Sequence, residues 1–305
     1  MNWIKKGIIY TPNFDDSWKN NSGLQPTPIV LKDRIRVFVG HRDSDGVGRI
    51  GFIDLDKSDP SRILGESDIP ALDIGEDGCF DDNGVIPCAV LKKGKEIHLY
   101  YAGYQIVKKT RFTVFGGLAI SKDEGKTFKR FSKAPVLDRA NEDTLFRVIH
   151  SIIPEDEGFK VYYGGGSNFI QGENKSLPVY IIKQFNSTSS NSFPNYGKTA
   201  IGIKEDEHRV GRPYVIKTKK KYLMFYGIGT ETTPYKLAYA ESKDGDNWTE
   251  KDDLQGLELS ENSWDSEMTA YPSVVQSDSK CFIFYNGNNY GRQGFGYAEL
   301  KGDLE

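Results

Sequence analysis

The sequence predicts an all-β fold, a five-bladed β-propeller that uses residues 1–305 as one domain. A unit of strand, tight polar turn and strand recurs five times, at a spacing of roughly 60 residues. The distance from the opening to the closing position is the same in every copy: 26 to 39, 87 to 100, 150 to 163, 213 to 226 and 272 to 285. One small sheet cannot bury both of its faces, so such units stack around an axis. The constant distance disfavours the alternative, a sandwich of unrelated hairpins.

The elements follow in order along the chain. Residues 7–10 are expected to form a strand that pairs near 294–300 and closes the ring. His150 replaces the opening proline in the third copy, which is therefore degenerate. Residues 57–79 are interpreted as a connector because they lack a helical period. Small-residue strands are expected after four copies, at 48–54, 116–121, 237–242 and 294–300.

Two short motifs predict hairpin turns. Residues 121–128 read S-x-D-x-G-x-T-F, and residues 242–248 are a looser version that ends in tryptophan. Asp and Gly favour tight turns, and the aromatic side chain anchors the turn to the sheet. We interpret both motifs as structural.

Composition excludes several classes of function. A formal net charge of −3 argues against a nucleic-acid or membrane-surface partner that is held by bulk charge. Three cysteines without metal-ligand spacing are typical of a reduced, cytoplasmic protein. The first residues carry no signal-peptide pattern, and no apolar stretch is long enough to span a membrane. The histidines are isolated and no nucleotide-binding loop is found, so we expect neither a bound metal nor a cofactor.

The repeat unit reads carboxylate-x₄-Pro-strand-turn-strand-Tyr. It resembles the five-bladed propellers of the glycoside-hydrolase superfamily that contains arabinanases, β-xylosidases, invertases, levansucrases and β-mannoside phosphorylases. It is most similar to propeller proteins of bacterial surface-polysaccharide biosynthesis, on the segments FDDNGV at 80–85, RP at 212–213 and WDSE at 264–267. The resemblance implies a central funnel in which acids from different blades act on a carbohydrate. The invertase-type N-D-P-N-G motif is absent, which implies a changed mechanism or no hydrolysis.

The resemblance points to Asp82 and Glu267 as catalytic acids. Each lies five residues before a blade-opening proline, Pro87 or Pro272. Glycosyl transfer needs one carboxyl group to protonate the leaving oxygen and another to act as base or nucleophile. We assign the first role to Glu267 and the second to Asp82. The alternative is that both are turn carboxylates that accept backbone N–H groups.

Further residues are candidates for substrate binding because they lie at blade starts or in loops at the expected funnel. They are Asp81, Arg42, Asp43, Glu142, Arg147, His150, Arg212, Trp264, Asp265 and Tyr271. Trp264 or Tyr271 would supply an apolar wall that raises the pKa of Glu267, and both are candidates for stacking on sugar faces. Core packing is the alternative for these rings.

Arg147, Arg212 and His150 lie at the starts of blades. If they converge, they form a cationic floor that binds a phosphate or a sugar carboxylate. The alternative is that each arginine neutralises a nearby acid, for instance Arg212 with Glu207.

These observations predict a glycosidase-like enzyme that cleaves or transfers a glycosyl unit of a bacterial surface glycan or its precursor. One alternative is a phosphorylase or glycosyltransferase that uses a sugar-phosphate or nucleotide-sugar donor. The other is a glycan-binding propeller without catalysis. The expected partner is a carbohydrate or sugar phosphate in each case.

Overall fold

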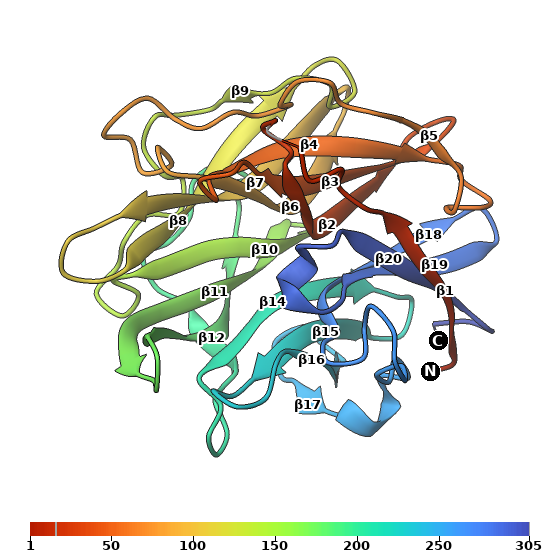
Figure 1. The fold of residues 1–305 in the computed structure, drawn as a ribbon. Coiled ribbons are helices and arrows are strands. Elements are labelled where there is room, and N and C mark those ends of the chain that lie inside the picture. Colours follow the sequence, from red (N-terminus) through yellow and green to blue (C-terminus); the bar gives the residue numbers. More distant parts are fainter. Residues whose placement is uncertain (16, 305) are drawn as a thin grey trace.

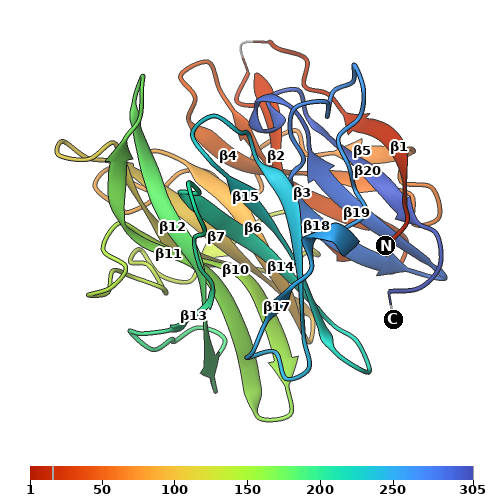
Figure 2. The same ribbon diagram turned by 90° about the horizontal axis from the view of Figure 1, so that it is seen from below.

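The computed structural model describes residues 1–15 and 17–304; positions 16 and 305 of the predicted domain lie outside the described residues. Within these ranges the chain is built from strands β1 to β20, with two single-turn 3₁₀ helices, Asp252–Leu254 and Asn289–Gly291. Pairing sorts the described strands into five antiparallel sheets of four strands each, two junctions being bridged by short parallel pairings (Figures 1 and 2). The predicted all-β propeller is confirmed.

Each sheet is one blade, and its first strand is the innermost. The innermost strands of blades one to five are β2 (Asn21–Val30), β6 (Val85–Lys93), β10 (Phe146–Glu155), β14 (Arg209–Lys217) and β18 (Ala270–Ser277). These five strands contact one another in cyclic order around the centre. The second strands are β3 (Ile35–Arg42), β7 (Glu96–Ile106), β11 (Gly158–Gln171), β15 (Tyr222–Gly229) and β19 (Lys280–Asn286).

The outer half of each blade is shorter and more varied. The third strands are β4 (Gly48–Leu55), β8 (Phe112–Ser121), β12 (Ser176–Ser187), β16 (Lys236–Ser242) and β20 (Phe295–Leu300). The outermost strands are β5 (Ile63–Glu66), β9 (Lys129–Arg130), β13 (Lys198–Ile201), β17 (Thr249–Glu250) and β1 (Trp3–Tyr10). Residues 57–79 are therefore not only a connector, because β5 completes blade one from within them. All four residues of β5 are exposed, so no buried alternation marked the strand in the sequence.

The N-terminal strand closes the ring. Gly7 of β1 pairs with Tyr297 of β20, and Tyr10 pairs with Phe295, as predicted for residues 7–10. The backbone N–H of Lys301 donates to the carbonyl oxygen of Asn2 at 2.9 Å, and the two chain ends lie side by side in both views (Figures 1 and 2). The last blade is thus built from both ends of the chain.

Buried apolar side chains fill the gaps between neighbouring blades. On β19, Phe282 and Phe284 face blade one, whereas Ile283 and Tyr285 face blade four. Successive side chains of a strand point to opposite faces, so each blade contributes to two such clusters. A cluster of this kind occupies each of the five gaps among the described residues, and a sixth lies near the centre. None of the helices in the described part of the chain is long and apolar enough to cross a membrane.

Candidate active site

Every innermost strand carries a register shift where it passes the central axis. In blades one, four and five the shifted segment holds an X-Pro pair, in which X is Gln25, Arg212 or Tyr271. These three residues have φ angles of 52°, 55° and 54°, in the left-handed region that non-glycine residues rarely adopt. A bulge re-aims a side chain, and proline suits it because the ring needs no ladder hydrogen bond. The repeated bulge directs these three side chains into one cavity.

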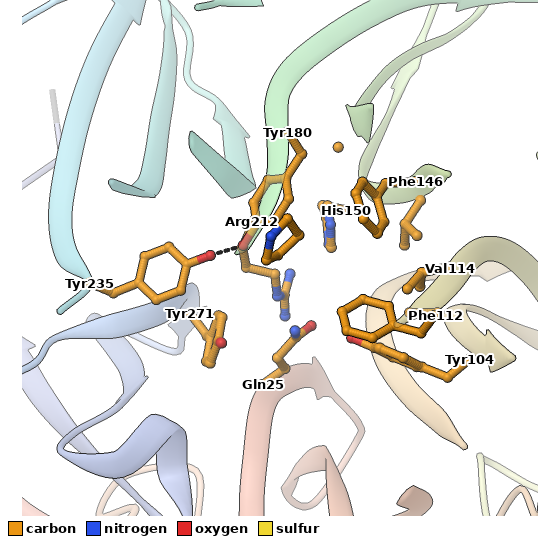
Figure 3. Close-up of a pocket in the computed structure, with 14 residues that line it drawn as sticks. Gln25, Tyr104, Phe112, Val114, Phe146, His150, Tyr180, Arg212, Tyr235 and Tyr271 are labelled. Carbon is orange, nitrogen blue, oxygen red and sulfur yellow. Dashed lines mark hydrogen bonds between the residues drawn. The ribbon is translucent and has the colours of Figure 1, made fainter. Parts of the chain in front are cut away.

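This central cavity has a volume of about 150 Å³ and is mostly apolar. Six aromatic rings surround it: Tyr104, Phe112, Phe146, Tyr180, Tyr235 and Tyr271 (Figure 3). The hydroxyl groups of Tyr180 and Tyr235 are hydrogen-bonded to each other. Gln25, His150 and Arg212 supply the polar side chains, apart from the tyrosine hydroxyls. No Asp or Glu is among the described residues that line it.

Arg212 crosses the cavity floor from blade four. Its Nη1 donates to the carbonyl oxygen of Cys88 in blade two at 2.7 Å, and its Nη2 donates to Thr27 Oγ1 in blade one at 2.9 Å. The side chain is buried, and burial lowers the pKa of the guanidinium group. The alternative partner Glu207 instead accepts the backbone N–H of Lys204. Arg212 has no carboxylate partner among the described residues.

His150 lies beside Arg212 at the floor. Burial lowers the pKa of its imidazole well below the usual value, and the positive charge of Arg212 adds to this effect. The ring is therefore neutral at pH 7. Its Nδ1 atom is buried and has no hydrogen-bond partner in the described part of the chain.

Arg147 does not join this floor. Its Nη1 and Nη2 donate to the carbonyl oxygens of Asp138 and Pro194, and its Nε lies 3.8 Å from Asp143. The guanidinium group also packs over the ring of Tyr163. Arg147 therefore does not converge with Arg212 and His150, and of the two alternatives the nearby acid describes Arg147.

Three blade-start carboxylates share one buried arrangement. Each accepts a hydrogen bond from the tyrosine twenty residues later and pairs with a cation: Asp81 with Tyr101 and Arg130, Asp143 with Tyr163 and Lys183, and Asp265 with Tyr285 and Lys5. The cation lies 2.6–2.8 Å from the carboxylate oxygen in all three cases. The side chains of these acids are at most 1 % exposed, so they brace the blades and do not face the cavity. Asp81 and Asp265, predicted to bind substrate, have this structural role.

Asp82 and Glu267 lie on segments that border the cavity without lining it. Asp82 Oδ2 accepts the backbone N–H of Gly78 at 2.9 Å, whereas the side chain of Glu267 is exposed. Next to Asp82, the N–H of Asn83 donates to the carbonyl oxygen of Tyr104 at 3.1 Å. Two residues after Glu267, the N–H of Thr269 donates to the carbonyl oxygen of Tyr235, also at 3.1 Å. The segments that carry the two acids are thus hydrogen-bonded to the backbone of two residues that line the cavity, and the catalytic roles of Asp82 and Glu267 stay predictions.

The two predicted stacking residues are separated. Trp264 stacks on Tyr285, with ring centres 4.9 Å apart, and packs against Gly287 and Gly296. These contacts are those of the packing alternative, and a role of Trp264 as a wall beside Glu267 stays a prediction. Tyr271 lines the cavity, where its ring lies 5.5 Å from that of Tyr235.

Of the remaining predicted residues, Asp43 and Glu142 do not line the cavity. Asp43 accepts the backbone N–H groups of Asp45 and Val47 and pairs with Arg49, which is a turn. Exposed Glu142 lies 3.4 Å from Lys183.

Arg42, in contrast, is near the cavity. Burial raises the pKa of Tyr104 to about 12, and the positive charge of Arg42 opposes that rise. Burial also raises the pKa of Tyr271, and the positive charge of Arg42 acts against that rise as well.

Sequence reasoning missed several residues of the cavity. Gln25 precedes a blade-opening proline as Arg212 and Tyr271 do, so its position was a usable signal. Tyr180 and Tyr235 come from outer parts of their blades and carried no such signal. Arg209 was also missed; it does not line the cavity, but its guanidinium group packs 4.7 Å from the ring centre of Tyr235 and donates to the hydroxyl of Tyr290. The described residues contain no group of three His, Cys, Asp or Glu side chains placed to hold a metal ion.

Comparison with known proteins defines the fold. No protein-family model matches the sequence. The uncharacterized protein Rv1502 of Mycobacterium tuberculosis is 29 % identical over 303 residues, which are 99 % of this chain and 100 % of that protein.

Solved structures are more informative. A glycoside hydrolase superposes with a TM-score of 0.74 at 19 % identity, covering 98 % of this chain and 92 % of its own. A thermostable family-43 glycoside hydrolase gives 0.70 at 18 % identity, with 97 % and 94 % covered. The β-1,2-mannobiose phosphorylase of Listeria innocua gives 0.72 at 13 % identity, with 99 % and 97 % covered. The protein therefore has the β-propeller fold of glycoside-hydrolase-type enzymes, as the sequence resemblance predicted.

Proposed function

We propose that this protein is a carbohydrate-active enzyme that cleaves or transfers a glycosyl unit at its central cavity. One observation carries the proposal: an aromatic-walled cavity at the propeller axis is bordered by segments that carry two candidate acids. Small-molecule sites are typically apolar pockets with a few placed polar groups. Aromatic faces such as those of Tyr104 and Tyr271 are suited to the apolar faces of a sugar ring.

Glu267 is proposed as the general acid and Asp82 as the base or nucleophile. Glu267 is exposed, and its segment is hydrogen-bonded to Tyr235 of the cavity, which supports its assignment as the group that meets the leaving oxygen of a bound glycoside. The hydrogen bond from Gly78 holds one oxygen of Asp82 and leaves the other available. Both groups are needed: the acid donates a proton to the leaving oxygen, and the carboxylate either accepts a proton from the attacking water or donates an electron pair to the anomeric carbon.

The proposed substrate is a bacterial surface glycan or its precursor, on the strength of the resemblance to polysaccharide-biosynthesis propellers. We also propose a cytoplasmic location. The three cysteines are free thiols, and Cys88 and Cys281 are buried, which fits a reducing compartment.

The test is ligand binding and turnover over a panel of oligosaccharides, sugar phosphates and nucleotide sugars. Wild type is compared with Glu267→Gln and Asp82→Asn by NMR. Glu157→Gln is the matched control, because Glu157 is an exposed acid outside the cavity. We expect all four proteins to bind the same compounds, and only wild type and the control to convert them. Full turnover by Glu267→Gln would remove Glu267 as the acid.

A glycan-binding propeller without catalysis is the second candidate. It is favoured by the lining of the cavity, which holds no carboxylate among the described residues. Binding of one compound class by all four proteins, with no conversion by any of them, would favour this reading.

A further inference from the structure

Arg212 is a buried cation whose charge is not matched by a carboxylate among the described residues. We propose that Arg212 and Gln25 form a binding site for an anionic group, a carboxylate or a phosphate, at the floor of the central cavity. The inference rests on the proposed function, since it specifies that the glycosyl ligand brings an anionic group to this floor.

The donors at the floor are incompletely used. A guanidinium group has five N–H donors, and Arg212 spends two of them on Cys88 and Thr27. Its Nε atom is buried and has no partner in the described structure. The remaining donors permit the forked contact that guanidinium groups make with carboxylates and phosphates.

Gln25 adds a second donor from the neighbouring side. Its side chain is 8 % exposed and points into the cavity (Figure 3). The thiol of Cys88 lies 3.7 Å from its amide oxygen, which leaves the amide nitrogen as the group available to a ligand. An amide N–H₂ beside a guanidinium group favours an acceptor that carries negative charge.

Other buried arginines show what Arg212 lacks. Arg36 pairs with Asp54 at 2.6 Å, and the Nε of Arg147 lies 3.8 Å from Asp143. Burying an unpaired charge is costly, and a neutral donor would suffice to bridge Cys88 and Thr27. A ligand anion would offset that cost. Binding such an anion requires a positive charge, whereas the hydrogen bonds to Cys88 and Thr27 do not.

The surroundings favour the same ligand. Arg42 and Arg209 place two further positive charges close enough to act on Tyr271, which lines the cavity. Neutral His150 adds no repulsion to a cation at the floor. Aromatic rings exclude water, and a charge pair is stronger where water is excluded. The cavity therefore combines apolar walls for a sugar face with a cationic floor.

The experiment measures dissociation constants by calorimetry with glucose, glucuronate, glucose 1-phosphate and inorganic phosphate. We expect wild type to bind at least one anionic probe at least 10-fold more tightly than glucose. Arg212→Gln should weaken that binding about 10- to 100-fold, the size expected for lost hydrogen bonds to a charged group. Arg147→Gln is the matched control, a buried arginine outside the cavity, and should leave the dissociation constant unchanged.

The choice of probes distinguishes a free anion from an anion attached to a sugar, and it separates the proposed anion site from the proposed enzymatic function. Tight binding of inorganic phosphate alone would identify a free phosphate, whereas tighter binding of glucuronate or glucose 1-phosphate would place the anion on the sugar. If Arg212→Gln does not fold, Gln25→Leu replaces it, with a smaller loss of about 5- to 10-fold.

The inference is overturned if glucose binds as tightly as the anionic probes. It also fails if no anion binds at millimolar concentration, or if the folded variants bind as wild type does. Conversion of neutral glycans alone would sink this inference and leave the proposed function standing. Anion-selective binding without any turnover would support the anion site and contradict the proposed enzymatic function.

Discussion

Buried charge has two forms in this propeller, and they differ in what surrounds them. The blade-start acids Asp81, Asp143 and Asp265 are each held by a tyrosine and a cation. Arg212 is also buried, but its partners are a carbonyl oxygen and a hydroxyl group. A satisfied buried charge braces the fold, whereas an unmatched one is expected where a ligand completes it. Burial alone therefore did not separate structural from functional residues; the partners did.

The sharpest test of this contrast uses two acids only two residues apart. Glu267→Gln should reduce turnover about 100- to 10,000-fold, because general acid catalysis is lost, and should change stability by less than about 0.5 kcal/mol, because the side chain is exposed. Asp265→Asn should do the opposite and lower stability while each folded molecule keeps its activity. Steady-state kinetics and chemical denaturation of both variants check this. Equal effects of the two changes on turnover would break the comparison.

Asp143→Ala should give the largest loss of stability. The change leaves Lys183 and Arg147 buried without their carboxylate, and breaking a buried pair costs about 3–5 kcal/mol. Denaturant unfolding followed by fluorescence measures the loss. Tyr163→Phe, which removes only the hydroxyl that donates to Asp143, should cost about 1 kcal/mol. A loss for Asp143→Ala no larger than that of Tyr163→Phe would show that the charge pairing contributes little.

Without ligand, Arg212→Gln should cost far less than Asp143→Ala, about 1 kcal/mol. The two hydrogen bonds are lost, but the cost of burying an unmatched charge disappears with them. The same denaturation experiment measures this. A loss as large as that of Asp143→Ala would mean that Arg212 is chiefly a structural bridge and would weaken the anion site.

A smaller effect is expected from an acid outside both groups. Burial alone would raise the pKa of Asp123, but hydrogen bonds from Ser121, Thr127 and Lys126 outweigh burial and lower the pKa to about 2. A lowered pKa stabilises the fold above the ordinary value of 3.8, and this contribution is lost as the pH falls from about 4 to 2. Because the carboxylate is exposed, we expect at most about 1 kcal/mol. Asp123→Asn should flatten this part of the pH profile of the melting temperature; an unchanged profile would contradict the assignment.

The sequence by itself determined the repeat and therefore the blades. Strands predicted at 48–54 and 237–242 are found as Gly48–Leu55 and Lys236–Ser242, because small, alternating residues encode a strand locally. The turn at 121–128 is local as well: Ser121 and Asp123 bond to groups at most four residues away. The prediction that residues 7–10 close the ring followed from the propeller fold, in which the opening strand often pairs with the last blade, and the pairing of β1 with β20 confirms it.

The site was decided by tertiary structure. Arg147 and Arg212 both lie at blade starts, three residues before His150 and one residue before Pro213. Only Arg212 lies at the axis, because the bulge before Pro213 turns its side chain inward. His150 lies there too, although it replaces the proline. Tyr180 and Tyr235 reach the cavity from different blades and share no sequence spacing. Spacing along a chain encodes strands and turns, but which side chains meet at the centre depends on bulges and on the packing of five sheets against one another.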